Sequence, residues 1–126
     1  MELPPYVLPL LDVARDESSI QWQAFRAGID RYVLYGDPDQ GPSAALLRYQ
    51  PGAGAPLHRH TGYEHIILVR GSQRDQHGLY TEGSVIVNPP GSEHWVASDD
   101  GCLALLIWER PVIFLDPSSA NGAGLG

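Results

Sequence analysis

The sequence predicts one all-β domain in which short strands form a small barrel or sandwich. Three observations favour this fold class. Short runs rich in β-branched and aromatic residues recur between clusters of glycine and proline, about eight to ten times along the chain. No run has the periodicity of a long amphipathic helix. A length of 126 residues suits one domain and is enough to bury a core without disulfides.

The chain divides into three parts of different composition. Residues 1–19 form a proline-containing N-terminal arm, residues 20–115 carry the predicted strands, and residues 116–126 are small, polar and rich in glycine. Small polar segments of this kind cannot bury enough apolar surface to become ordered. We therefore expect one folded domain at 20–115 and a flexible C-terminal tail.

The arm is expected to be extended. Pro4, Pro5 and Pro9 oppose a regular helix there, since proline lacks a backbone N–H and fixes its own φ angle. Residues 7–13 are apolar enough to form an edge strand that packs on its own sheet or on that of a second copy. We therefore expect the protein to form a homodimer.

Residues 20–28 fit two structures. Ser18 or Ser19 could cap a helix that Gly28 ends. Against this, the apolar residues alternate with glutamines over 20–24, which is the strand period. We favour a strand, because the rest of the chain reads as strands and turns.

The remaining strands follow in order, separated by turn residues. The run Gly36–Pro42 and the triplet Pro89–Gly91 are the strongest turn signals. Between and beyond them we expect strands at 29–35, 43–49, 64–69, 84–88, 94–98, 102–109 and 111–115, with a short hairpin segment at 71–78.

The charge balance argues against two classes of partner. Lys+Arg number 8 and Asp+Glu number 15, giving a formal net charge of −7. A net negative charge opposes nonspecific binding to nucleic acid and to anionic membranes. The start of the chain does not resemble a signal peptide, and the apolar run 7–11 is too short to span a bilayer. We expect a soluble, cytoplasmic protein with a small-molecule substrate or ligand.

Four side chains have spacings that suit one divalent metal ion. His58 and His60 lie on one face of an extended segment, one pleat apart. Glu64 follows a short turn that can fold the chain back toward them, and His94 must arrive from another strand. Imidazole and carboxylate ligands suit Zn, Fe, Mn, Ni or Cu. Cys102 is the only cysteine, so an internal disulfide and a cysteine-based zinc cluster are excluded.

Two stretches of the chain resemble the two motifs of the cupin family. The first motif is a glycine, five residues, His-x-His, three residues, Glu, six residues and a glycine, which matches Gly52, His58, His60, Glu64 and Gly71. The second is a glycine, five residues, Pro-x-Gly, two residues and a His, which matches Gly83, Pro89, Gly91 and His94. The family usually has Asn four residues later, where this chain has Ser98.

The short link between the motifs most resembles the cupin domain of ChrR-type anti-sigma factors. The resemblance covers about residues 20–115 and implies a single-domain cupin jelly-roll β-barrel. It also implies that His58, His60, Glu64 and His94 bind the metal ion. ChrR-type proteins carry a separate helical zinc-binding domain that grips the sigma factor. This chain has no room and no cysteines for it, so an anti-sigma role is not expected.

The resemblance leaves two functions open. The same cupins are similar to small iron dioxygenases that cleave hydroxyketones or diketones, which favours an Fe(II) dioxygenase in which Glu64, as the catalytic residue, shifts to admit substrate. The alternative is a non-catalytic zinc cupin that binds or senses a small ligand. We expect one divalent metal ion as the cofactor. Fe and Zn are favoured over Mn, Ni and Cu. A purely structural role is disfavoured, because the ligand set is complete.

Overall fold

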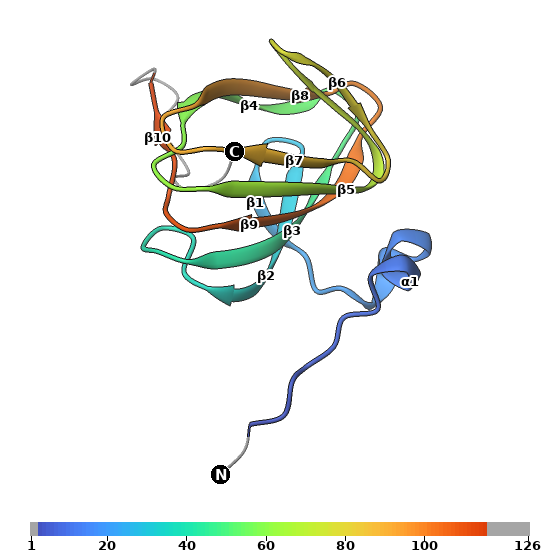
Figure 1. Ribbon diagram of the computed structural model, residues 1–126. Helices are drawn as coiled ribbons and strands as arrows, with labels where there is room; N and C mark the ends of the chain where they lie inside the picture. The colour runs from blue at the N-terminus through green and yellow to red at the C-terminus, as the bar shows by residue number, and fades with distance from the viewer. Residues whose placement is uncertain (1–2, 116–126) are drawn as a thin grey trace.

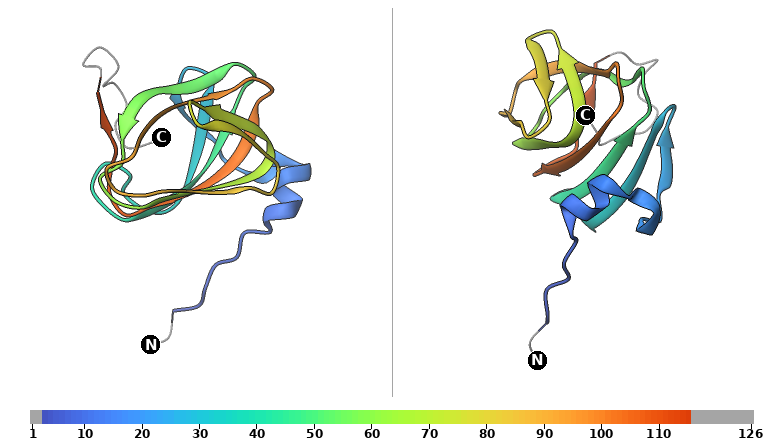
Figure 2. Two further views of the ribbon diagram at one scale, coloured as in Figure 1. Left: turned by 45° about the horizontal axis from the view of Figure 1, so that its top comes forward. Right: turned by 90° about the vertical axis from the view of Figure 1, so that its right-hand side faces the viewer.

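One curled antiparallel sheet makes up most of the molecule and closes into a half-barrel (Figures 1 and 2). The structure is a computed structural model that describes residues 3–115, so the predicted tail at 116–126 lies outside the described residues. Over residues 3–115, no helix has the length and apolar character that crossing a bilayer requires. The predicted all-β class is confirmed.

The strands lie close to the predicted ranges. Their order across the sheet is β1-β2-β3-β9-β5-β8-β4-β10, with β6 and β7 each paired to β5. β5 is longer than expected, because it continues into the predicted hairpin segment and pairs there with β6. The bounds are β1 (Gln23–Arg26), β2 (Ile29–Gly36), β3 (Ser43–Tyr49), β4 (Ala53–Arg59), β5 (Glu64–Asp75), β6 (Gly78–Thr81), β7 (Val85–Asn88), β8 (Glu93–Ser98), β9 (Cys102–Trp108) and β10 (Ile113–Phe114).

The expectation of an extended strand at residues 7–13 is wrong, because most of that stretch is helical. The α-helix α1 spans Leu10–Arg15 and is followed by the 3₁₀ helix η1 at Glu17–Ser19. Pro9 occupies the N-cap position, so all three prolines precede the helix instead of interrupting it. Asp12 in the first turn and Arg15 in the last turn have the charges that the helix dipole favours.

Helix α1 covers part of the outer face of the sheet. Val13 is 2% exposed and packs with Leu46, Val69 and Leu103 on β3, β5 and β9. Ile20 and Trp22 pack on the same cluster, and strand β1 begins only at Gln23. The alternation over 20–24 therefore indicated extended chain correctly. Its first residues, 20–22, are not paired in the sheet, and Ile20 and Trp22 pack against the outer face of the sheet.

The barrel interior is built by alternate residues of the central strands. On β5, Ile66 and Leu68 are buried and face Leu106 and Ala104 of β9 inside the barrel. Strand parity gives Glu64 the same inward direction and turns its neighbour His65 outward. The polar site residue Glu64 is thus followed on the same face by the apolar residues Ile66 and Leu68.

The two glycines that bound the first motif differ in what surrounds them. Both have positive φ angles, +87° for Gly52 and +81° for Gly71. A Cβ on Gly52 would meet nothing within 4 Å, whereas one on Gly71 would lie 2.2 Å from the carbonyl oxygen of Gly101. Gly71 therefore allows β5 to approach β9 closely, in addition to making a turn.

Replacing Gly71 by alanine should destabilise the protein more than replacing Gly52. The positive φ angle alone costs about 1–2 kcal/mol for a residue with a Cβ, and this applies to both variants. Only Gly71→Ala also forces two strands apart. Urea unfolding should show the larger fall in unfolding free energy for Gly71→Ala, and equal losses in the two variants would contradict the proposed close approach.

Candidate metal centre

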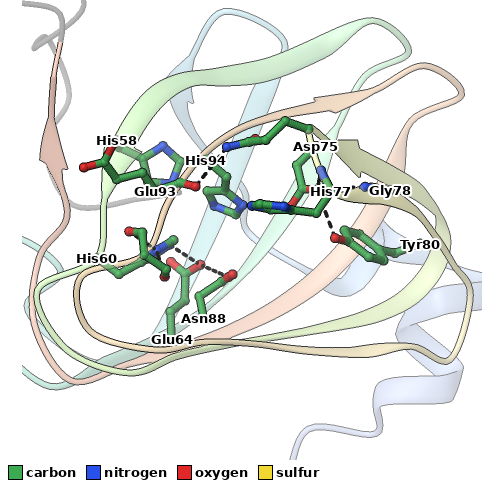
Figure 3. A network of polar contacts seen from close by, with 12 residues as sticks. His58, His60, Glu64, Asp75, His77, Gly78, Tyr80, Asn88, Glu93 and His94 are labelled. Atoms are coloured by element: carbon green, nitrogen blue, oxygen red, sulfur yellow. Dashed lines mark hydrogen bonds and ion pairs between the residues drawn. The ribbon is translucent and has the colours of Figure 1, made fainter.

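Three histidines meet inside the half-barrel. His58 lies on β4, His60 directly follows that strand, and His94 lies on β8 opposite His58 in the strand register. Their candidate ligand atoms lie within 4.8 Å of one another, and each residue is at most 2% exposed (Figure 3). The sequence-predicted histidine ligands are therefore brought together.

The turns predicted from proline and glycine hold these strands in place. The amide of Gly91 donates to the carbonyl of His60, and the amide of His60 donates to the carbonyl of Ser92. On the other side of His60, the amide of Tyr63 donates to the carboxylate of Glu109 at 2.8 Å. The chain before and after His60 is thus tied to two other loops, which limits its movement.

Each histidine ring is oriented by a hydrogen bond at Nδ1. His58 Nδ1 lies 2.7 Å from the carbonyl oxygen of Pro56, and His60 Nδ1 lies 3.1 Å from that of Ser92. A carbonyl oxygen only accepts, so Nδ1 carries the proton and Nε2 keeps its lone pair. This is the tautomer with which a histidine binds a metal ion through Nε2.

The third ring is oriented by a carboxylate. His94 Nδ1 lies 3.1 Å from Oδ2 of Asp75, at the end of β5. The other oxygen of Asp75 accepts from the backbone of His77 and from the hydroxyl of Tyr80, so the carboxylate is fixed in turn (Figure 3). Carboxylate–histidine pairs of this kind orient metal-binding rings and make them more basic.

Glu64 joins the cluster from β5. Its Oε1 lies 3.1 Å from His60 Nε2 and accepts a hydrogen bond of 3.1 Å from Asn88 Nδ2. Two ligands with bonds of about 2.1 Å to one ion lie roughly 3 Å apart, which matches the contact between His60 and Glu64. The predicted fourth ligand is therefore beside His60, whereas the group of candidate ligand atoms within 4.8 Å of one another consists of the three histidines.

Three buried atoms at the centre have no hydrogen-bond partner among the described residues. They are Nε2 of His58, Nε2 of His94 and Oε2 of Glu64. Each is a lone-pair atom, and leaving a buried polar group unsatisfied costs about 1–3 kcal/mol. A divalent cation would satisfy all three together, so the residues present fit a bound metal ion.

The pKa shifts of the buried groups favour the protonation states in which histidine and glutamate bind a cation. Burial lowers the pKa of His58 to about 4, and burial also lowers the pKa of His94 despite the opposing effect of Asp75. Burial acts to raise the pKa of Glu64, but contact with His60 and the other two rings outweighs it, so that pKa is lowered. His58 and His94 are thus neutral and the carboxylate is anionic at neutral pH.

Sequence reasoning missed the residues that support the ligands. Asn88 faces Glu64 only because β5 and β7 pair in that register, and Asp75 reaches His94 through the pairing of β5 with β8. No local spacing signals either contact. Ser98, where the second motif usually has Asn, is fully buried and donates to the carbonyl of Ser72, so it ties β8 to β5.

Replacing Asp75 by asparagine should weaken metal binding about 10- to 100-fold, because the ring of His94 loses its charged acceptor. The matched control is Asp99→Asn, which removes an exposed carboxylate paired with Arg74. A competition titration against a chromophoric chelator measures both affinities. Equal affinities in wild type and Asp75→Asn would show that the contact with His94 does not support a metal site.

A groove lies on the outside of the sheet. It has a volume of about 480 Å³, and its lining includes Tyr35, His65, Val87 and Ile107. His65 faces outward as expected, so it is separated from Glu64 by the sheet itself. The histidine cluster and this groove are therefore distinct features.

Comparison with known proteins agrees with this fold. The profile of the ChrR cupin-like domain matches residues 11–110. The chain is 28% identical over 110 residues to the anti-sigma-E factor ChrR of Cereibacter sphaeroides, covering 84% of this chain and 50% of that protein. It therefore spans about half the length of this curated relative.

Solved structures show the same architecture at low identity. The acetylacetone dioxygenase from Acinetobacter johnsonii aligns with a TM-score of 0.75 and 17% identity, over 100% of this chain and 87% of the other. The complex of Rhodobacter sphaeroides SigE with the anti-sigma ChrR aligns with a TM-score of 0.68 and 24% identity, over 80% and 56% of the two chains. These likenesses show the fold, and the profile match over residues 11–110 shows that the chain belongs to the family of ChrR cupin-like domains.

Proposed function

We propose that the protein is a metal-dependent enzyme that uses dioxygen on a small chelating organic substrate. The observation that carries this is the meeting of three buried histidines, whose candidate ligand atoms lie within 4.8 Å of one another, with Glu64 in contact with His60. Such a donor set suits a redox-active divalent ion such as Fe(II) as well as zinc. The fold likeness to an acetylacetone dioxygenase supports the same reaction class.

The bound ion would polarise substrate oxygens and give dioxygen a place to react. The protein itself would hold that ion and exclude water. His58, His60 and His94 are fixed by their Nδ1 contacts, whereas Glu64 is held through Oε1 alone. Glu64 is therefore the ligand whose second oxygen can move to make room for a substrate.

The apolar interior suits such a reaction. Ile66, Leu106 and Val96 are buried around the inward rows that carry the cluster, and Ile86 packs against them. Apolar walls keep bulk water away from a reactive centre. The net charge of −7 agrees with a small molecule as the partner instead of nucleic acid.

Oxygen uptake tests this proposal. The purified chain is loaded separately with Fe, Mn, Ni, Cu or Zn and mixed with a panel of β-diketones and hydroxyacetophenones in an oxygen electrode. We expect substrate-dependent uptake with iron, lost in His94→Ala and kept in the surface variant Asp99→Asn. If no metal-loaded form of the protein consumes oxygen with any substrate, although each is shown to contain its metal, the proposed enzymatic activity is refuted.

A second candidate is a non-catalytic zinc cupin that binds or senses a small ligand. The 28% identity to ChrR over 110 residues favours it. Zinc has no redox chemistry with dioxygen, so the two candidates differ in the metal that the protein retains. Tightly held zinc in freshly purified protein, together with no oxygen uptake after iron loading, would support the second candidate.

A further inference from the structure

Phe114 forms one wall of the histidine cluster. It stands opposite His58 in the pairing of β10 with β4, so both side chains point to the same face of the sheet. Their ring centroids are 5.7 Å apart in an edge-to-face arrangement. A group that contacts the Phe114 ring is therefore one aromatic ring away from the candidate metal ligand His58.

The group on that ring is the guanidinium of Arg26. Its Cζ lies 4.7 Å from the ring centroid of Phe114 and 5.2 Å from that of Phe25. Arg26 belongs to β1 and Phe114 to β10, the two ends of the strand order. Their contact therefore joins the two end strands of the curled sheet and places a positive charge against the aromatic ring beside His58.

A second guanidinium strengthens this charge. Arg31 Cζ lies 4.9 Å from the ring centroid of Phe25, which thus contacts two arginines. Both arginines are partly buried, and both lie in a chain whose formal net charge is −7. Aromatic faces hold guanidinium groups in a defined plane and withdraw them partly from water.

Tyr49 links this charge to the interior of the barrel. It is 3% exposed, and burial raises its pKa, with Cys102 and Glu64 raising it further and Arg26 lowering it. Tyr49 belongs to the buried cluster that fills the barrel, and Phe25, which contacts Arg26, packs against the same cluster.

We propose that Arg26, held between Phe25 and Phe114, binds a carboxylate at the far end of the substrate while the chelating oxygens face the histidine cluster. The substrate class is accordingly a diketone or hydroxyketone acid instead of a neutral diketone. This inference rests on the proposed function, since the chelating end requires the metal ion. A guanidinium pairs with a carboxylate through two parallel hydrogen bonds, which gives geometric selectivity as well as affinity.

Binding to the zinc-loaded protein tests the inference without turnover. The probes are succinylacetone, a β-diketone with a carboxylate on a short arm, and its methyl ester, which has the same chelating end without the charge. Calorimetry should show that wild-type protein binds the acid about 10- to 100-fold more tightly than the ester, as expected for a hydrogen-bonded charge pair.

The variants separate charge recognition from packing. Arg26→Gln should bring the affinities for acid and ester to within about twofold, and Arg26→Lys should keep part of the preference. The control is Arg15→Gln, which removes the same charge from an exposed site on α1 and should keep the whole preference. Metal content, measured on every sample, shows whether the site itself is intact.

The outcomes distinguish a failure of the role of Arg26 from a failure of the metal site itself. If the wild-type protein holds zinc but binds acid and ester equally, the role of Arg26 is refuted and the metal site stands. The same conclusion follows if Arg26→Gln retains zinc and weakens both probes by the same factor, because the residue then acts only in packing. If the chain takes up no metal, the proposed function fails and the inference fails with it.

Discussion

Replacing His60 by alanine should reduce the bound metal from about one ion per chain to less than about a tenth of that. His60 is 1% exposed, and its Nε2 lies 3.1 Å from Oε1 of Glu64, so its loss removes a central ligand and leaves a hole that no neighbouring donor fills. Elemental analysis of the purified variant measures the result.

The matched control for this variant is His65→Ala. His65 is also a histidine next to the cluster in sequence, but it lies on the outer face of β5 and lines the external groove. This variant should keep its full metal content. Stoichiometric metal in His60→Ala, or equal losses in both variants, would refute the assignment of the site.

Removing the metal should lower the thermal stability of the protein markedly. The ligands come from β4, β5 and β8, which the unfolded chain does not hold together, so the ion binds the folded state preferentially. At free metal 1,000 times the dissociation constant, binding stabilises a fold by about 4 kcal/mol. For a domain of this size the midpoint should fall by roughly 10–20 °C on chelation.

Calorimetry with and without a chelator measures this shift, and adding metal back should restore the midpoint. The variant His60→Ala provides the control, since its midpoint should not respond to metal or chelator. If wild-type protein that has lost its metal keeps the same thermal unfolding midpoint, the bound ion does not stabilise the fold.

The ligands and the barrel were predictable because the two motifs fix them locally. Gly71 requires a positive φ angle and a close backbone approach, and the inward position of Glu64 follows from strand parity. The choice of the four candidate ligands therefore needs no knowledge of strand pairing. The homodimer, the location in the cell and the native metal remain predictions.

What could not be predicted depends on pairings between distant strands. Asp75 and Asn88 reach the ligands only through the register of β5 with β8 and β7, which no local pattern reveals. Arg26 meets Phe114 only because the sheet curls until side chains of its two end strands come into contact. The N-terminal helix was missed for a different reason: proline opposes a helix in its interior but is tolerated at its start, and Pro9 stands at the N-cap of α1.

Anomalous diffraction from a crystal of the metal-loaded protein, recorded on both sides of the absorption edge of the metal, tests the central claim most directly. We predict a single peak at about 2.0–2.2 Å from Nε2 of His58, His60 and His94 and from a carboxylate oxygen of Glu64. A peak bound by other residues, or a loaded protein with no peak among these four side chains, would contradict the proposed metal centre.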